Sequence, residues 1–224
     1  MLMLSIPRET YYEILSYLER EEQQMYRLVS KHALEIIKPS RVHLLDFGAT
    51  RGIVEYCSVG LSRRDTSEKA CMLAAKNGHL EVLKYLRSAG CPWDKWVCNY
   101  AAKHGHLEVI KYAMSAGCPC DIWTCSYAAK HGHLEVLKYV RSSGYPCDVC
   151  VCIDAAQNGH LEVLKYARKS GCPWDSRVCD YAARNGHLEI LRWAVDNDCP
   201  RRGLVANLDQ YPQHVREYVL GACR

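Results

Sequence analysis

Cysteine and histidine are the residues of this chain with the greatest chemical potential. Its 224 residues include 14 cysteines and 10 histidines, and both side chains bind metals and take part in nucleophilic catalysis. Cys147, Cys150 and Cys152 with His160 form the set best suited to zinc. A helix turns about 100° per residue, so Cys150 and Cys152 would point about 200° apart. We therefore expect no metal and no cofactor, with zinc at this set as the alternative.

The histidines argue against catalysis because five of them recur at one constant interval. These are His79, His106, His133, His160 and His187. A residue type that every copy keeps at one place is explained by folding. We expect these histidines to hydrogen-bond the turn backbone between helices. Paired carboxylates, a glycine-rich phosphate loop and a metal-binding motif are missing from the sequence, so we predict that the chain is not an enzyme.

The five histidines belong to an internal repeat. Five copies of the phrase Asn/His-Gly-His-Leu-Glu, each followed by an apolar stretch, recur with a constant period of 27 in residue number. A fixed period of this length is typical of stacked supersecondary units, each of which contacts its neighbours. The sequence therefore predicts an all-α solenoid.

Each copy is predicted to form a helical hairpin. In the second copy Asp94 is a residue type that caps a helix start, and Gly105 can adopt the left-handed conformation that ends a helix. These two residues bound the first helix, helix A. Helix B starts near His106 and ends at Gly117, which a proline follows closely. The equivalent caps in the other copies are Ser67, Asp121, Asp148 and Asp175.

Helix A is predicted to have one face that packs into the core and an opposite face that is not needed for packing. In the second copy positions 96, 99, 100 and 103 point away from the small core residues, and the copies differ there. Tryptophan, tyrosine and arginine at such positions dominate the energetics of binding interfaces. The candidate target-binding residues are Trp96, Asn99, Tyr100, Lys103, Trp123, Tyr127, Lys130, Arg177, Tyr181 and Arg184.

Two alternatives to a binding face stay open. The indoles of Trp96 and Trp123 could fold down over the neighbouring repeat, and the lysine row could be a solvated face. Trp93 and Trp174 lie beside helix caps, where an apolar residue staples the chain, so we expect them to pack.

Most cysteines fall on two registers of the repeat, one in helix A and one after the repeat glycine. Equivalent positions in neighbouring units should lie about 8–10 Å apart, beyond the limit of about 7 Å between the Cα atoms of a disulfide. We expect small buried thiols in a reducing compartment. The two sets are Cys71, Cys98, Cys125, Cys152 and Cys179, and Cys91, Cys118, Cys172 and Cys199.

The phrase Ala-Ala-x-Asn/His-Gly-His-Leu-Glu-Val resembles the ankyrin repeat over residues 68–198. It departs from that family in lacking the Thr-Pro-Leu-His opening of helix A and in a period about six residues below the usual 33. The missing residues fall in the loop that forms the projecting finger. Fingers should therefore be short or absent, and ligand contacts should move onto helix A. The resemblance implies a protein-binding solenoid without catalysis.

The first forty residues resemble the F-box, a helical module that docks on the Skp-family adaptor of cullin-RING ubiquitin ligases. The spacing from Pro7 to Leu18 to Val29 carries this resemblance, and Gln23 and Gln24 depart from it. Chains that combine the two motifs resemble a group in large DNA viruses, which implies the host cytoplasm. The implied adaptor-binding residues are Ile6, Pro7, Glu9, Ile14, Leu15, Leu18 and Val29.

Composition narrows the function further. The net charge is +4, with basic and acidic residues interleaved, so nucleic acid is an unlikely partner. No uncharged apolar run approaches the roughly 18 residues of a membrane span. We expect a substrate-recognition subunit of an SCF-type ubiquitin ligase or, as the alternative, a plain scaffold whose N-terminal helices only cap the stack. The expected parts are an F-box-like module (1–40), a degenerate repeat (41–66), ankyrin-type repeats (67–198) and a C-terminal capping segment (199–224).

Overall fold

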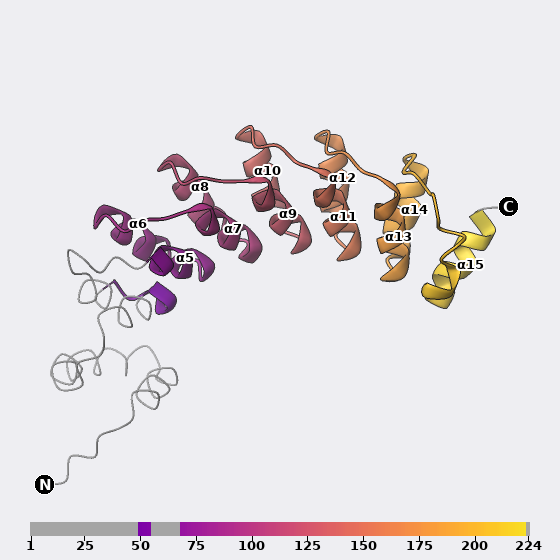
Figure 1. Ribbon diagram of the computed structural model, residues 1–224, viewed down its shortest axis with the longest axis horizontal. Helices are drawn as coiled ribbons and strands as arrows, with labels where there is room; N and C mark the ends of the chain where they lie inside the picture. Colours follow the sequence, from indigo (N-terminus) through magenta and orange to yellow (C-terminus); the bar gives the residue numbers. More distant parts are fainter. Residues whose placement is uncertain (1–48, 55–67, 223–224) are drawn as a thin grey trace, which may run out of the picture.

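A computed structural model describes residues 49–54 and 68–222 of the chain (Figure 1). The candidate adaptor-binding residues between Ile6 and Val29 lie outside the described residues, as does the Ser67 cap. They stay predictions.

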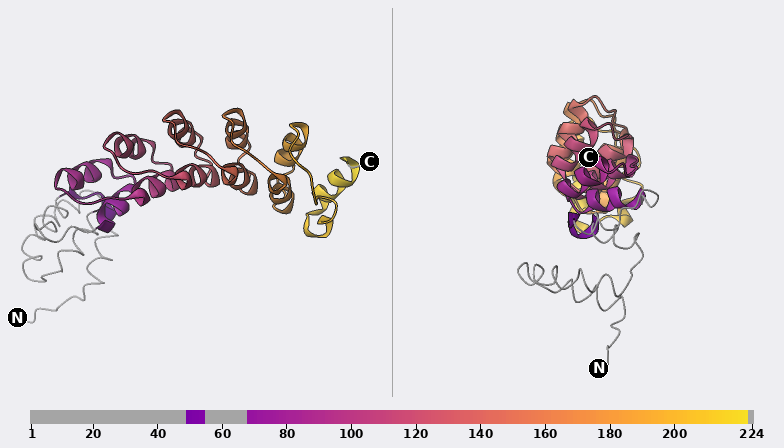
Figure 2. Two further views of the ribbon diagram at one scale, coloured as in Figure 1. Left: turned by 45° about the horizontal axis from the view of Figure 1, so that its top comes forward. Right: turned by 90° about the vertical axis from the view of Figure 1, so that its left-hand side faces the viewer.

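The described residues form an all-α solenoid of helical hairpins, as the constant repeat period predicts. Figures 1 and 2 show two rows of helices that curve together, with the A helices on the inner side of the arc and α15 at the far end. The A helices are α5 (Glu68–Lys76), α7 (Lys95–His104), α9 (Ile122–Lys130), α11 (Val149–Gln157) and α13 (Ser176–Arg184). The B helices are α6 (Leu80–Ser88), α8 (Leu107–Ser115), α10 (Leu134–Ser142), α12 (Leu161–Lys169) and α14 (Leu188–Asp196). A 3-10 turn, η1 (Leu208–Gln210), and α15 (Gln213–Ala222) complete the order.

Local signals start and stop the A helices where the sequence indicates. The side chain of Asp94 accepts a hydrogen bond from the Trp96 backbone N–H at 3.0 Å, and Asp121, Asp148 and Asp175 cap their helices in the same way. The repeat glycines have φ between 76° and 84°, a backbone conformation that side chains with a Cβ resist. Only short loops such as 116–121 join one hairpin to the next, without a strand among the described residues.

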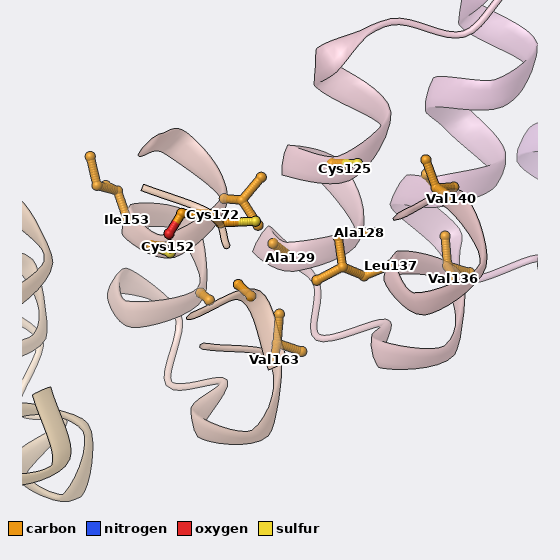
Figure 3. Close-up of a cluster of buried hydrophobic side chains, with 14 of the residues drawn as sticks. Cys125, Ala128, Ala129, Val136, Leu137, Val140, Cys152, Ile153, Val163 and Cys172 are labelled. Atoms are coloured by element: carbon orange, nitrogen blue, oxygen red, sulfur yellow. Dashed lines mark hydrogen bonds between the residues drawn. The ribbon is translucent and has the colours of Figure 1, made fainter. Parts of the chain in front are cut away.

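The core is continuous because each helix packs against its own hairpin and against the next. α9 contacts α7 and α11, and α10 contacts α8 and α12. Figure 3 shows Leu137 of α10 beside Ala128 and Ala129 of α9, and Cys152 of α11 beside Cys172 in the loop after α12. Small alanine and cysteine side chains let the A helices approach each other closely.

The repeat histidines join neighbouring hairpins. The Nε2 atom of His106 donates a hydrogen bond to the carbonyl oxygen of Lys76, the last residue of α5, at 3.1 Å. The same ring lies over Gly78, where an added Cβ would stand 2.7 Å from it. Equivalent bonds from His133, His160 and His187 are 3.1–3.2 Å long. The expected histidine bond to turn backbone is therefore present, and it crosses from one repeat to the preceding one.

The contact of a histidine ring with the backbone of the preceding unit, which we call the histidine joint, also occurs at both ends of the stack. His79 donates to the Thr50 carbonyl at 3.0 Å and its ring packs on Gly52, whose φ is 76°. Only residues 49–54 of the predicted degenerate repeat (41–66) are described, so that repeat stays a prediction. At the other end His214, one full period after His187, donates to the Gly186 carbonyl at 3.2 Å. His214 was not identified from the sequence, because the residues around it depart from the repeat phrase.

One expectation about the cysteines is wrong. Cys147 and Cys172 form a disulfide with their Cα atoms 5.5 Å apart. The expected separation of about 8–10 Å applies to equivalent positions one full period apart. These two cysteines are instead separated by 25 residues and belong to different registers. Most thiols of the two repeated registers are buried and unbridged, as expected, with Cys172 the exception among the described residues.

Candidate functional site: the free face of the inner helices

Two indoles stand exposed on the inner row of helices. Trp96 of α7 and Trp123 of α9 occupy the same place in consecutive repeats, two residues after the capping aspartates, and are 41% and 49% exposed. The Trp96 ring lies 5.9 Å from that of Tyr100. Neither indole is buried in the core.

A small pocket lies at the junction of α7 and α9. Its lining residues are Trp96, Asn99, Tyr100, Lys103 and Tyr127. All five were candidate target-binding residues from the sequence, and the structure brings them together. The pocket combines three aromatic rings with an amide and an ammonium group, a composition suited to binding a polar group between apolar walls.

Asn99 is buried, contrary to the expectation that it lies on the exposed face. Its side chain is 1% exposed, and its Oδ1 atom accepts a hydrogen bond of 2.7 Å from the Thr124 hydroxyl of α9. The neighbouring A helices pack so closely that α9 covers this position of α7. The Asn99 Nδ2 atom and the Ser126 hydroxyl have no hydrogen-bond partner among the described residues. Buried polar groups are rarely left unpaired, which singles out this junction.

Three lysines near the C-terminal ends of inner helices form no ion pair within the described residues. Lys76, Lys103 and Lys130 stand at the ends of α5, α7 and α9 without a carboxylate within bonding distance in the described chain. Burial, followed by the charges of Lys103 and neighbouring cations, lowers the pKa of His104 beside this row. The outer row differs, since its lysines pair with a glutamate three residues earlier at 2.7–2.8 Å: Lys84, Lys111, Lys138 and Lys165.

The structure does not bring Arg177, Tyr181 and Arg184 into the same site. α11 separates α13 from α9. Arg177 donates to both carboxylate oxygens of its own cap, Asp175, at 2.8–3.1 Å, and hydrogen bonds from Arg177 lower the pKa of Asp175. Arg184 pairs with Asp180 at 2.8 Å.

Asp180 anchors the C-terminal segment. Its Oδ1 atom accepts hydrogen bonds from the Tyr211 hydroxyl at 2.9 Å and from Asn207 at 3.1 Å. Burial and the contact with Asp180 raise the pKa of Tyr211 to about 12. The inner face of α13 is therefore engaged in holding the end of the stack.

Trp93 and Trp174 pack, as predicted. The Arg87 guanidinium lies over the Trp93 ring at 4.1 Å and Arg168 lies over Trp174 at 4.2 Å. Both arginines also donate to a loop carbonyl, that of Cys91 and that of Cys172 respectively, at 2.7 Å. Each arginine therefore holds a tryptophan and the loop between two hairpins together. The sequence analysis did not identify these arginines.

The alternative zinc set is not available as a thiol cluster. Cys147 is held in the disulfide with Cys172, and the described part of the chain holds no group of three potential ligands. Nor does any described helix have the length and apolar character to cross a membrane.

Family models match most of the repeat region. Residues 71–151 match a model of three ankyrin repeats, and residues 152–195 match a model of multiple ankyrin repeats. The chain belongs to the ankyrin-repeat family. Among solved structures, this ankyrin-repeat chain is similar to the crystal structure of the human ASB11 ankyrin repeat domain, with a TM-score of 0.59 and 14% identity over 69% of this chain and 83% of that one. That likeness shows the fold. No curated protein sequence matches the chain.

The ankyrin repeat is an interaction fold, and the chain thus presents a protein-binding solenoid. Its shortened loops leave the inner helices as the surface with exposed aromatic and cationic side chains.

Proposed function

We propose that this chain is a non-enzymatic substrate-recognition adaptor. It captures a protein target on the inner face of α7 and α9 and recruits a Skp-family adaptor of a cullin-RING ubiquitin ligase through its N-terminal segment. The observation that carries target capture is the pair of exposed indoles beside the pocket on these two helices. Large aromatic side chains exposed side by side are typical of binding hot spots.

The ligase part rests on the F-box resemblance of residues 1–40 and is tested through that segment. We expect the full chain to retain a co-expressed Skp-family adaptor on affinity resin. Leu15→Asp places a charge in the apolar docking surface and should abolish retention, whereas Lys111→Ala on the outer helix α8 should not. An intact chain that retains no adaptor would leave the plain scaffold as the function.

Target capture is tested independently of the adaptor. Proximity labelling in cells should identify proteins that the wild-type chain labels and that the double variant Trp96→Ala/Trp123→Ala labels at least tenfold less. Glu108→Ala/Lys111→Ala on α8 is the matched control, because it removes two exposed side chains from the outer row. Equal labelling by the wild type and the tryptophan variant contradicts the proposed face.

A further inference from the structure

We propose that the pocket between α7 and α9 accepts the carboxylate of an aspartate or glutamate from an acidic segment of the protein target. The carboxylate sits between the amide of Asn99 and the ammonium group of Lys103. This inference rests on the proposed function and specifies the chemistry of the partner.

The first observation is the unpaired amide. The Asn99 side chain lines the pocket and is 1% exposed. The hydroxyl of Thr124 satisfies its Oδ1 atom, while its Nδ2 atom has no partner among the described residues. An amide N–H is a donor only, so the group that satisfies it must be an acceptor. A carboxylate oxygen is the strongest acceptor that a protein side chain supplies.

The second observation is the charge around the pocket. Lys103 lines it, and Lys76 and Lys130 continue the row on the adjacent helices, all without ion pairs in the described residues. The row ends at α11, where Gln157 takes the lysine register. This row of three lysines thus covers α5, α7 and α9, and the last two helices also carry the exposed indoles. An anionic partner fits this part of the solenoid and not its C-terminal half.

The third observation concerns the class of partner. Nucleic acid presents a phosphate at every nucleotide and is bound by surfaces that gather many lysines and arginines. Here Lys76, Lys103 and Lys130 place one ammonium group per repeat along a single line, and three rings line the pocket. A side chain fits such a pocket, and Trp123, 49% exposed on the next repeat, offers a surface for an apolar neighbour of the acidic residue. We therefore infer an acidic peptide segment that also carries an apolar residue.

A selection from a displayed library of random 12-residue peptides on the full chain tests the inference. We expect enriched peptides to carry aspartate or glutamate next to an apolar residue. A labelled enriched peptide, followed by fluorescence anisotropy, should bind at least tenfold more weakly once its acidic residue is replaced by the amide. Lys103→Glu should weaken binding by a similar factor, and a peptide with lysine at the acidic position should regain affinity for this variant. Lys111→Glu on the outer row is the matched control and should bind like the wild type.

The outcomes separate this inference from the function beneath it. Peptides that lack an acidic preference but lose binding with Trp96→Ala/Trp123→Ala overturn the carboxylate pocket and leave target capture in place. Peptides whose binding ignores both variants overturn the face itself, and a selection that enriches no peptide overturns the pocket. A labelled 20-nucleotide oligo-dT that binds more tightly than the peptides, and loses binding with Lys103→Glu, replaces the protein target by nucleic acid. Thermal unfolding of every variant establishes that it is folded.

Discussion

Two aspartates of the inner helices have carboxyl pKa values displaced in opposite directions. Burial raises the pKa of Asp154 to about 6, with the charge of Asp148 adding to the effect and that of Lys130 opposing it. Hydrogen bonds from Arg177 lower the pKa of Asp175. Asp154 occupies a position that holds tyrosine in three other repeats. A charged carboxylate thus stands at a partly buried position that usually holds an aromatic side chain.

Asp154→Asn should stabilise the protein at neutral pH. The folded-state pKa of about 6 exceeds the usual 3.8, so the folded protein binds this proton more tightly than the unfolded chain does. Stability from this group is full below about pH 4 and is lost as the pH rises to about 6. The free energy of unfolding of the variant should exceed that of the wild type by about 1–2 kcal/mol at pH 7.5 and by little at pH 4.

Urea denaturation at the two pH values measures this effect. Asp175→Asn is the control, because it makes the same change where the pKa is lowered and keeps an amide that can cap the helix. It should reduce stability at pH 7.5. A gain for Asp154→Asn that is equal at both pH values contradicts the desolvation argument.

In the first four hairpins, the turn glycine has a left-handed backbone and also lies against the histidine ring of the next repeat. Gly132 has a φ of 78°, and an added Cβ would stand 2.7 Å from the ring of His160 in the next repeat. Gly144, which ends the same hairpin, has a φ of 88° with nothing within 4 Å of an added Cβ. The first glycine serves the backbone and the joint between repeats, and the second serves the backbone alone.

The two glycines predict a measurable difference. Gly144→Ala should lower the free energy of unfolding by about 1–2 kcal/mol, from left-handed backbone strain alone. Gly132→Ala should lower it by clearly more, because the ring of His160 must also move. His160→Ala removes a hydrogen bond worth about 1 kcal/mol. In the double variant Gly132→Ala/His160→Ala the costs should be less than additive, since the clash is gone. Chemical denaturation of the four variants measures the coupling, and strict additivity would rule out the joint.

At the scale of the whole molecule, stability is the sum of hairpins and of the joints between them. Most joints use the histidine bond and the packed alanines. The disulfide acts within one hairpin instead, since Cys147 precedes α11 and Cys172 follows α12. The fourth hairpin is thus closed by a bond across its full length, which the other described hairpins lack.

Cys147→Ser should lower the stability of the oxidised protein. A disulfide across 25 residues restricts the unfolded chain by about 3 kcal/mol. Thermal unfolding without reductant should show a lower midpoint for the variant, and dithiothreitol should bring the wild type down toward it. Cys150→Ser is the matched control, because Cys150 is unbridged and half-buried. A midpoint of the wild type that dithiothreitol does not change means that the bond is not formed in solution.

The sequence by itself determined the hairpins, their caps and their period. These features depend on interactions within a few residues, such as Asp94 with the N–H of Trp96 or the left-handed Gly105. The same kinds of residue recur at these positions along the repeats. Helical geometry placed Trp96, Trp123 and Asn99 on one candidate face, but it left open whether the indoles are exposed, and the structure buries Asn99.

Only the tertiary structure decided which residues of neighbouring hairpins meet. Facing side chains are 25 residues apart, as in Thr124 with Asn99 and Cys172 with Cys147, and the histidine joints mostly span 30. Neither number is the repeat period, because the residues that meet hold different positions within their repeats. Such contacts bury Asn99, form the disulfide and place His214. They arise from the packing of whole helices, which the repeat phrase does not encode at any single position.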